Sequence, residues 1–381
     1  MTFRTLIVLF FLAFSAAESI GAEPVKIGLT LGLSGKYAEM SKNQMNGYRL
    51  WEKQVNSRGG LLGREVKIII YDDKSDTRIA KDLYEKLILT DKVDLLFGPY
   101  SSEIADAVFP VTEKYRYPVV SSGASSDSLF EKGYRYVFGT HTPASKIITG
   151  FLELLSLNGL NNIAIIHADD PFSIKVAEST GKWAERFGLN MVSSEGFRKG
   201  REDLDEFVLK AKESGAQGLI ICGHLDEAVN MRLALKRLNW FPKAYFATVG
   251  PTVTAFYDRL GKEAEHVFSS TNWEPNARFP GSDEFYKAFI KAYKYMPNQQ
   301  AAVAYAGGEV LEAAVKKAGS LDREKIRDSL AAMDAISIIG RYGVERTGLQ
   351  LKHFNFIIQW QNGKKEIVWP EELRTAKPIF K

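Results

Sequence analysis

The feature that most constrains the fold is an alternation between short apolar runs and amphipathic runs, which occurs twice along the chain. Apolar runs of four to eight residues predict buried strands, and runs with helical spacing predict helices. Such an alternation implies right-handed crossovers and parallel sheets that are covered on both faces. In the first half, strands are predicted at 25–31, 66–71, 93–97 and 118–121, and helices at 40–56, 76–89 and 102–115. In the second half, strands are predicted at 162–167, 189–194, 218–222 and 243–248, and helices at 172–187, 203–214 and 226–238.

The two repeats predict an α/β protein with two Rossmann-like lobes, whose parallel sheets are joined by a hinge. A chain of 381 residues that is 45% hydrophobic is long enough for two cores. Residues 282–330 are helical in pattern and have no strand partners, so they must pack on one of the lobes. Residues 354–369 predict a β-hairpin, because Asn362-Gly363 suits a tight turn. We expect lobe 1 and lobe 2 to comprise, respectively, residues 23–140 with 271–340, and residues 141–270 with 341–381.

The first residues predict a secretory signal peptide at 1–22. Arg4 supplies a positive start, residues 6–17 are apolar, and Ile20-Gly21-Ala22 is a small-x-small cleavage site. The alternative is a membrane anchor, but the apolar run is shorter than the roughly 20 residues that a span needs. We therefore expect cleavage near Ala22 and a periplasmic mature protein. The single cysteine, Cys222, excludes an internal disulfide, and its apolar context predicts a buried strand position.

Several functional classes are disfavoured by composition and by missing motifs. The net charge of +4 is small and scattered, which argues against nucleic acid as a partner. The turn at 31–35 lacks the dinucleotide-binding pattern, and neither a P-loop nor a nucleophile elbow occurs. The five histidines have no paired metal spacing, so each is expected to be a surface or supporting residue. The sequence therefore predicts a protein that is not an enzyme and has no cofactor or metal.

The loops that follow the predicted strands are rich in hydroxyls, free amides and aromatic rings. In an open α/β sheet, ligands bind beyond the carboxyl ends of the strands. Two of these loops, at Ser102 and Ser125, lead toward predicted helix N-termini, which favour anions such as carboxylates. Either serine alone could simply be a helix N-cap. Both together in adjacent loops predict a shared site. The four loops cover residues 33–37, 98–102, 121–126 and 168–172.

These loops belong to a set of motifs in which the sequence resembles a known family, the branched-chain amino acid-binding type of periplasmic solute receptor. The resemblance runs from residue 25 nearly to the C-terminus. It implies a type I periplasmic binding protein whose lobes close on a small molecule and whose partner is an ABC permease in the membrane. The motifs are VKIGLTLGLSG at 25–35, NSRGGLLGR at 56–64, Asp72-Asp73, GPYSS at 98–102 and SSGAS at 121–125.

The resemblance also implies a set of ligand-binding residues. The ligand carboxylate would be held by Ser102 and by the stretch from Gly123 to Ser125, and Tyr37 and Tyr305 would flank the ligand. The family often has Tyr where this chain has Phe172, and often an aromatic residue at Leu225. The complete set is Tyr37, Tyr100, Ser101, Ser102, Gly123, Ala124, Ser125, Phe172, Leu225, Thr252 and Tyr305.

The main departure from the family pattern is Thr252. Amino-acid-binding relatives tend to have Glu after the Gly-Pro pair at 250–251, where it would pair with the ligand ammonium group. Either Asp169 or Asp170 substitutes here, or the ligand has no ammonium; as the alternative, these two acids form a helix N-cap beside Pro171. We expect the solute-binding subunit of an ABC importer for an amino acid or a related small carboxylate or amide. A sensory receptor and, less favoured, an exported enzyme are the alternatives.

Overall fold

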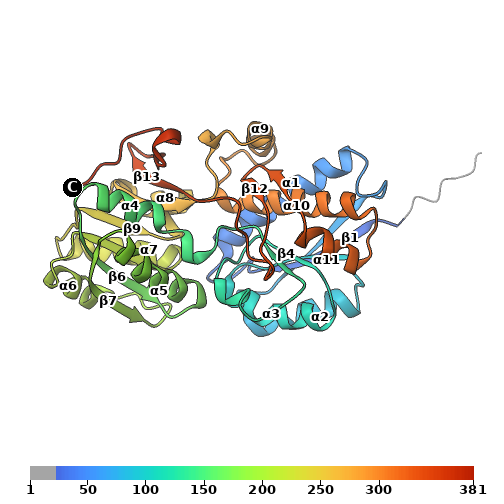
Figure 1. Cartoon of the computed structure of the whole chain (residues 1–381), viewed down its shortest axis with the longest axis horizontal. Helices are drawn as coiled ribbons and strands as arrows, with labels where there is room; N and C mark the ends of the chain where they lie inside the picture. The colour runs from blue at the N-terminus through green and yellow to red at the C-terminus, as the bar shows by residue number, and fades with distance from the viewer. Residues whose placement is uncertain (1–22) are drawn as a thin grey trace, which may run out of the picture.

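The computed structural model describes residues 23–381, so the expected signal peptide lies outside the described residues. The chain forms two bodies, each built around its own sheet, which lie side by side (Figure 1). We call the body around the first sheet lobe 1 and the body around the second sheet lobe 2. The predicted α/β architecture with two lobes is therefore confirmed.

The sheet of lobe 1 has five parallel strands in the order β2-β1-β3-β4-β5. β1 lies between β2 and β3 and is almost wholly buried, as expected for an interior strand with helices on both faces. The strands are β1 (Val25–Leu31), β2 (Val66–Asp72), β3 (Leu95–Phe97), β4 (Val119–Ser121) and β5 (Val137–Gly139).

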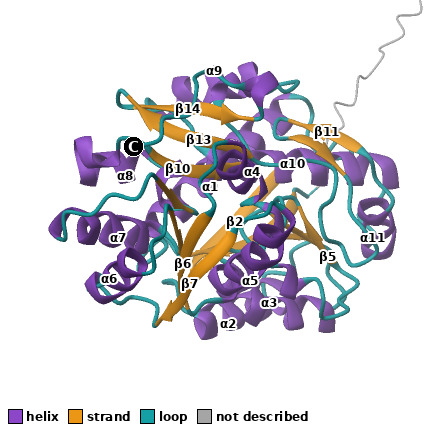
Figure 2. Ribbon diagram, turned by 60° about the vertical axis from the view of Figure 1, so that its left-hand side comes forward, coloured by secondary structure: helices purple, strands orange, loops and turns teal. Residues whose placement is uncertain are grey.

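The helices of lobe 1 cover both faces of this sheet (Figure 2). The helical stretch in the last third of the chain packs here, mainly through contact between α1 and α10. The apolar stripes of these helices therefore complete the core of lobe 1. The helices are α1 (Ala38–Ser57), α2 (Thr77–Leu89), α3 (Ser102–Lys114), α9 (Ser282–Tyr293), α10 (Gln299–Ala318) and α11 (Arg323–Ala331), and the short ribbon of β11 (Ala335–Ser337) and β12 (Gly340–Tyr342) follows them.

The sheet of lobe 2 has seven strands in the order β14-β13-β10-β9-β8-β6-β7. Its first five strands in sequence are parallel, and the predicted C-terminal hairpin adds two antiparallel strands beside β10. The strands are β6 (Asn162–Ala168), β7 (Asn190–Phe197), β8 (Gly218–Cys222), β9 (Ala244–Ala247), β10 (Val267–Thr271), β13 (Phe356–Gln361) and β14 (Lys364–Trp369). The helices are α4 (Thr149–Leu157), α5 (Pro171–Arg186), α6 (Asp205–Glu213), α7 (Leu225–Arg237) and α8 (Thr254–Leu260).

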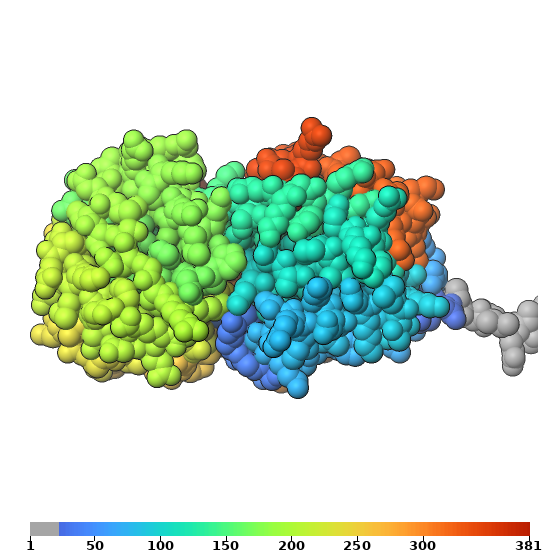
Figure 3. Space-filling view, turned by 90° about the horizontal axis from the view of Figure 1, so that it is seen from below, coloured from blue at the N-terminus to red at the C-terminus, as the bar shows by residue number. Residues whose placement is uncertain are grey.

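The chain passes between the lobes three times, after β5, after β10 and before β13. The third passage comes later than the boundary expected at residue 340. β12 pairs with β11, and the backbone N–H of Gly139 in β5 donates to the carbonyl of Gly348 at 2.9 Å. Residues 341–350 therefore lie against lobe 1. In the space-filling view the two bodies touch along a continuous boundary (Figure 3).

The sequence analysis missed six helices and strands, namely β5, β10, β11, β12, α4 and α8. β10 is fully buried although three of its five residues carry hydroxyls, so it lacks the apolar pattern of its neighbours. β5 has only three residues, too few to show a periodicity. Within residues 23–381, no helix is long and apolar enough to cross a membrane.

Candidate ligand-binding site between the lobes

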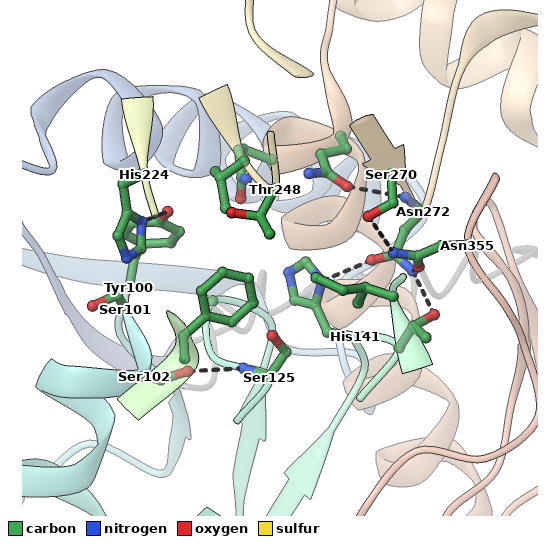
Figure 4. A pocket seen from close by; sticks show the side chains of 17 residues that line it. Tyr100, Ser101, Ser102, Ser125, His141, His224, Thr248, Ser270, Asn272 and Asn355 are labelled. Atoms are coloured by element: carbon green, nitrogen blue, oxygen red, sulfur yellow. Dashed lines mark hydrogen bonds between the residues drawn. The ribbon is translucent and has the colours of Figure 1, made fainter. Parts of the chain in front are cut away.

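A cavity lies between the lobes at the carboxyl edges of both sheets. Including its open mouth, the space between its walls measures about 490 Å³. Side chains from both lobes and from all three passages line it (Figure 4). The lining residues are Tyr100, Ser101, Ser102, Gly123, Ser125, His141, Thr142, Ile147, Phe172, His224, Thr248, Val249, Ser270, Asn272, Gln299, Gln300 and Asn355.

Six of the eleven expected ligand-binding residues line this cavity. They come from the loops after β3, β4 and β6, as the rule for the carboxyl edge of a parallel sheet requires. Ala124, between two of them, is buried but does not line the space. The six are Tyr100, Ser101, Ser102, Gly123, Ser125 and Phe172.

Four other expected residues lie outside the cavity. Tyr37 borders a second, more polar space between the lobes, and its ring packs 5.3 Å from the rings of Tyr100 and His224. Thr252 is fully buried, and its hydroxyl donates to the carbonyl of Val249 at 2.7 Å. Tyr305 packs against Phe285, and its hydroxyl contacts Gln54. Leu225 packs into the core of lobe 2.

The two serines singled out from the sequence meet at one edge of the cavity. Ser102 Oγ accepts hydrogen bonds from the backbone N–H groups of Ser125 at 3.2 Å and Ser126 at 3.1 Å. Ser102 begins α3, as predicted. Ser125 precedes only a single turn of 3₁₀-helix, residues 127–129, so the expected helix after it is short. The contact holds the β3 and β4 loops together beneath the cavity.

The cavity is electrostatically suited to an anion. Four helices of nine residues or more, α3, α5, α7 and α10, begin at its wall and direct their positive ends toward it. Ser101, the N-cap of α3, is buried, and its hydroxyl has no hydrogen-bond partner. In the part of the chain that the structure describes, no Asp, Glu, Lys or Arg side chain lines the cavity. A bound anion would therefore meet N–H and O–H groups without a competing carboxylate.

One wall of the cavity is built by a contact between the lobes. Tyr100 Oη lies 2.9 Å from His224 Nδ1, and the phenylalanine ring of Phe172 lies 5.8 Å from the imidazole. Behind this wall, Asp170 caps α5 by accepting from the N–H groups of Phe172 and Ser173. The N-cap interpretation of Asp170 is thus confirmed.

Asp170 stays ionised behind the wall. Burial alone would raise its pKa, but the neighbouring imidazole of His224 and the ammonium of Lys199 hold the pKa well below its usual range. Its carboxylate lies 3.7 Å from His224 Nε2. Asp169 instead accepts from the backbone N–H of Lys199 at 2.7 Å. Neither acid reaches the cavity, so neither replaces the glutamate of the family pattern there.

Sequence reasoning missed a polar cluster at the hinge, which we call the hinge cluster: His141, Thr142, Asn272 and Asn355. Asn272 Oδ1 lies 2.7 Å from His141 Nδ1, and Asn272 Nδ2 donates to Thr142 Oγ1 at 2.8 Å and to Asn355 Oδ1 at 2.6 Å. Burial lowers the pKa of His141 to about 4, so its imidazole is neutral at pH 7. His141 and His224 do not lie on the outer surface, because both line the cavity.

The hinge cluster joins the three passages between the lobes. His141 and Thr142 follow β5, Asn272 follows β10, and Asn355 precedes β13. Of the four residues, Asn272 could have been found by the rule that ligands bind beyond the carboxyl ends of strands, because it directly follows β10. That strand was not predicted. Since every member also lines the cavity, a ligand there would contact residues from all three passages between the lobes.

A second contact between the lobes lies outside the cavity. Glu103, in the first turn of α3, accepts from Tyr37 Oη at 2.6 Å and forms an ion pair with Lys199 of lobe 2 at 2.9 Å. Lys36 adds a third partner at 3.0 Å. Burial opposes the ionisation of Glu103, but Tyr37 and Lys199 more than offset it and lower the pKa to about 2. The cluster of Glu103, Lys199 and Tyr37 therefore holds the lobes in this closed arrangement at neutral pH.

We expect Glu103→Gln to weaken ligand binding about two- to fivefold, because a half-exposed ion pair contributes up to about 1 kcal/mol to the closed state. Isothermal titration at low and high ionic strength checks this, and the difference from wild type should shrink as salt screens the pair. Glu131→Gln removes the more exposed pair with Lys175, also between the lobes, and should change affinity less. Equal effects of the two variants would contradict the role of Glu103.

The described residues contain no group of three or more His, Cys, Asp or Glu side chains placed to hold a metal ion. Cys222 is buried in β8, as expected, and burial raises the pKa of its thiol. The thiol is therefore protonated and packs as a small apolar group.

Comparison with known proteins agrees with this architecture. The family described as "Periplasmic binding protein" matches residues 24–365. The "Leu/Ile/Val-binding protein homolog 7" of Brucella abortus is 25% identical, and the alignment covers 97% of each chain. Members of this family bind solutes and are not enzymes.

Two solved structures show the same fold with different ligands. The branched-chain amino acid substrate-binding protein LivJ of Streptococcus pneumoniae, solved with isoleucine, has a TM-score of 0.83 and 20% identity, and covers 94% of this chain and 100% of its own. A solute-binding protein of R. palustris, solved with benzoate, has a TM-score of 0.80 and 19% identity, and covers 94% and 97%. Because the family match spans most of the chain, the chain belongs to the periplasmic binding protein family.

Proposed function

We propose that the protein is the solute-binding subunit of an ABC importer and captures a small carboxylate in the periplasm by closing its two lobes. The expected signal peptide and the family support the location. The membrane permease would be its partner. The observation that carries the proposal is the cavity itself, where four helix N-termini meet and no Asp, Glu, Lys or Arg side chain of the described residues takes part in the lining.

The absence of an acidic side chain from the described lining distinguishes two kinds of ligand, namely α-amino acids and carboxylates without an ammonium group. An α-amino acid would bring a buried ammonium group into a cavity without a carboxylate to pair with it, and an unpaired buried charge is costly. Asp170 lies behind the cavity wall, but its carboxylate is already occupied by backbone N–H groups, Ser173 and His224. Among structures of this fold, isoleucine and benzoate are both bound. The lining here favours a carboxylate that has no ammonium group.

Binding would proceed in two steps. The ligand first meets Ser102, Ser125 and nearby backbone N–H groups on lobe 1, while lobe 2 is swung away. Phe172 and His224 then close over it, and the hinge cluster and Glu103 fix the closed arrangement. Ligand binding shifts the open–closed equilibrium, because only the closed form surrounds the ligand. The permease would recognise the closed surface, and no covalent step is needed.

The test is to identify the natural ligand and then to compare two ligand classes. We expect mass spectrometry of the denatured, freshly purified protein to release a carboxylate without an amino group. In titrations of the stripped protein, leucine and isoleucine should bind at least about 100-fold more weakly, since the missing charged partner is worth about 3 kcal/mol. Tight binding of leucine, or release of a ligand without a carboxylate, would contradict the proposal.

A further inference from the structure

We infer that the ligand is an aromatic carboxylate with a phenolic hydroxyl, and that Gln300 selects for this hydroxyl. The inference rests on the proposed function of the same cavity and names the ligand more narrowly. Three observations carry it, namely an unpaired carboxamide, a set of rings in the cavity wall, and the separation of the two polar sides of the cavity.

Gln300 is the second residue of α10 and lines the cavity. Its side chain is only 2% exposed, yet Oε1 has no hydrogen-bond partner, and the carboxamide makes no hydrogen bond to any described residue. The adjacent Gln299 differs, because its Oε1 accepts from the backbone N–H of Asn272 at 2.9 Å. Buried polar side chains are nearly always hydrogen-bonded, so the free carboxamide of Gln300 needs a partner from the ligand.

A hydroxyl is the partner that fits this carboxamide in either orientation. The oxygen and nitrogen of a glutamine can exchange places by a flip, so the exposed edge either accepts or donates. A hydroxyl donates to the oxygen and accepts from the nitrogen. A ligand carboxylate could accept a hydrogen bond only from the nitrogen of Gln300. It is better placed at Ser102 and the helix N-termini.

The body of the ligand meets aromatic walls. Tyr100, Phe172 and His224 all line the cavity, and the imidazole lies 5.8 Å from each of the other two rings. Ile147 and Val249 add apolar surface. A flat ring packs against such walls with little loss of conformational entropy, and aromatic pairs at these separations attract one another.

The two polar sides of the cavity lie apart. Ser102 and Ser125 meet at one side, whereas Asn272 and Asn355 lie at another (Figure 4). The bond from Asn272 to Gln299 places the start of α10 on the Asn272 side. A ring that carries a carboxylate at one end and a hydroxyl at the other would satisfy both sides at once.

The experiment is a comparison of ligands that differ only in the hydroxyl, on two forms of the protein. Benzoate, 3-hydroxybenzoate, 4-hydroxybenzoate and 3,4-dihydroxybenzoate are titrated into stripped wild type and Gln300→Leu. We expect at least one hydroxylated acid to bind wild type about tenfold more tightly than benzoate does. In Gln300→Leu this ratio should fall to about one, with benzoate bound as tightly as before or more tightly.

The controls separate a local effect from a loss of structure. Thermal unfolding of the ligand-free variant reports its folding, and Gln300→Met provides a second variant of similar length. Gln217→Leu, which removes a half-buried carboxamide that accepts from Asn162 at 3.2 Å in lobe 2, should keep the wild-type ratio.

The inference is overturned if benzoate matches every hydroxylated acid in wild type, or if the preference persists in both Gln300 variants. It is also overturned if none of the four acids binds while denaturation releases another carboxylate, and in that case the proposed function stands. Release of a ligand without a carboxylate would contradict both this inference and the proposed function.

Discussion

Replacement of Asn272 by leucine is expected to lower the free energy of unfolding by about 3–5 kcal/mol. The side chains are similar in size, so the change removes hydrogen bonds without opening a large space. His141, Thr142 and Asn355 each lose a buried partner. A buried polar group left unpaired costs about 1–3 kcal/mol, and three such groups give the expected total after partial relaxation. Urea unfolding of ligand-free protein measures it.

The position of Asn272 means that its replacement should affect ligand binding as well as folding. The hinge cluster ties together the only three passages between the lobes that the described chain makes, and it lines the cavity. We therefore expect Asn272→Leu to lose ligand affinity by more than tenfold as well. Asn190→Leu is the matched control, because Asn190 is exposed at the start of β7 and far from the cavity lining; it should change stability by less than about 0.5 kcal/mol. Similar losses in the two variants would contradict the role of the hinge cluster.

The fold could be predicted because its information is local and repeated. β8 is apolar from end to end, and β1 is interrupted only by Lys26 and Thr30. The helices carry apolar stripes, so the alternation appears without any tertiary information. β10 was not predicted, because its buried hydroxyls find hydrogen-bond partners only in the folded chain. Ser269 donates to the carbonyl of Thr248, and Thr271 donates to the carbonyl of Trp273. Such partners cannot be read from the strand's own residues.

The site was predictable only where the carboxyl-edge rule applies to strands that were found. The loops after β3, β4 and β6 supplied the six predicted residues that line the cavity. The hinge cluster and Gln300 come from segments whose positions depend on how the chain returns between the lobes. Tyr305 shows that the family resemblance can also mislead. The resemblance implies that this aromatic residue flanks the ligand, whereas in this chain its hydroxyl contacts Gln54.

The edge of the cavity at Ser102 and Ser125 depends on close contact between the β3 and β4 loops, and Gly123 allows this contact. A Cβ atom at Gly123 would lie 2.4 Å from the carbonyl oxygen and 2.9 Å from the carbonyl carbon of Pro99. Both atoms belong to the backbone of the β3 loop, so no side-chain rotation relieves the overlap. Pro99 precedes Tyr100, Ser101 and Ser102, and the displacement would pass directly to the residues that line the cavity.

Gly123→Ala is therefore expected to separate the β3 and β4 loops and to break the contact between Ser102 and the N–H groups of Ser125 and Ser126. Ser102 and the loop at Ser125, which we propose to hold the ligand carboxylate, then lose their positions. We expect an affinity loss of about 100-fold or more, since displacements of an ångström in a binding site are costly. Native mass spectrometry measures the fraction of purified protein that retains a small molecule.

Gly181→Ala is the control, because the added Cβ in α5 would meet only the flexible end of Met191 at 3.0 Å. Alanine in a helix interior is favoured over glycine by about 1 kcal/mol, so this control should bind normally and unfold at an equal or higher temperature. Retention of ligand by Gly123→Ala at the wild-type level would show that the serine edge does not hold the carboxylate.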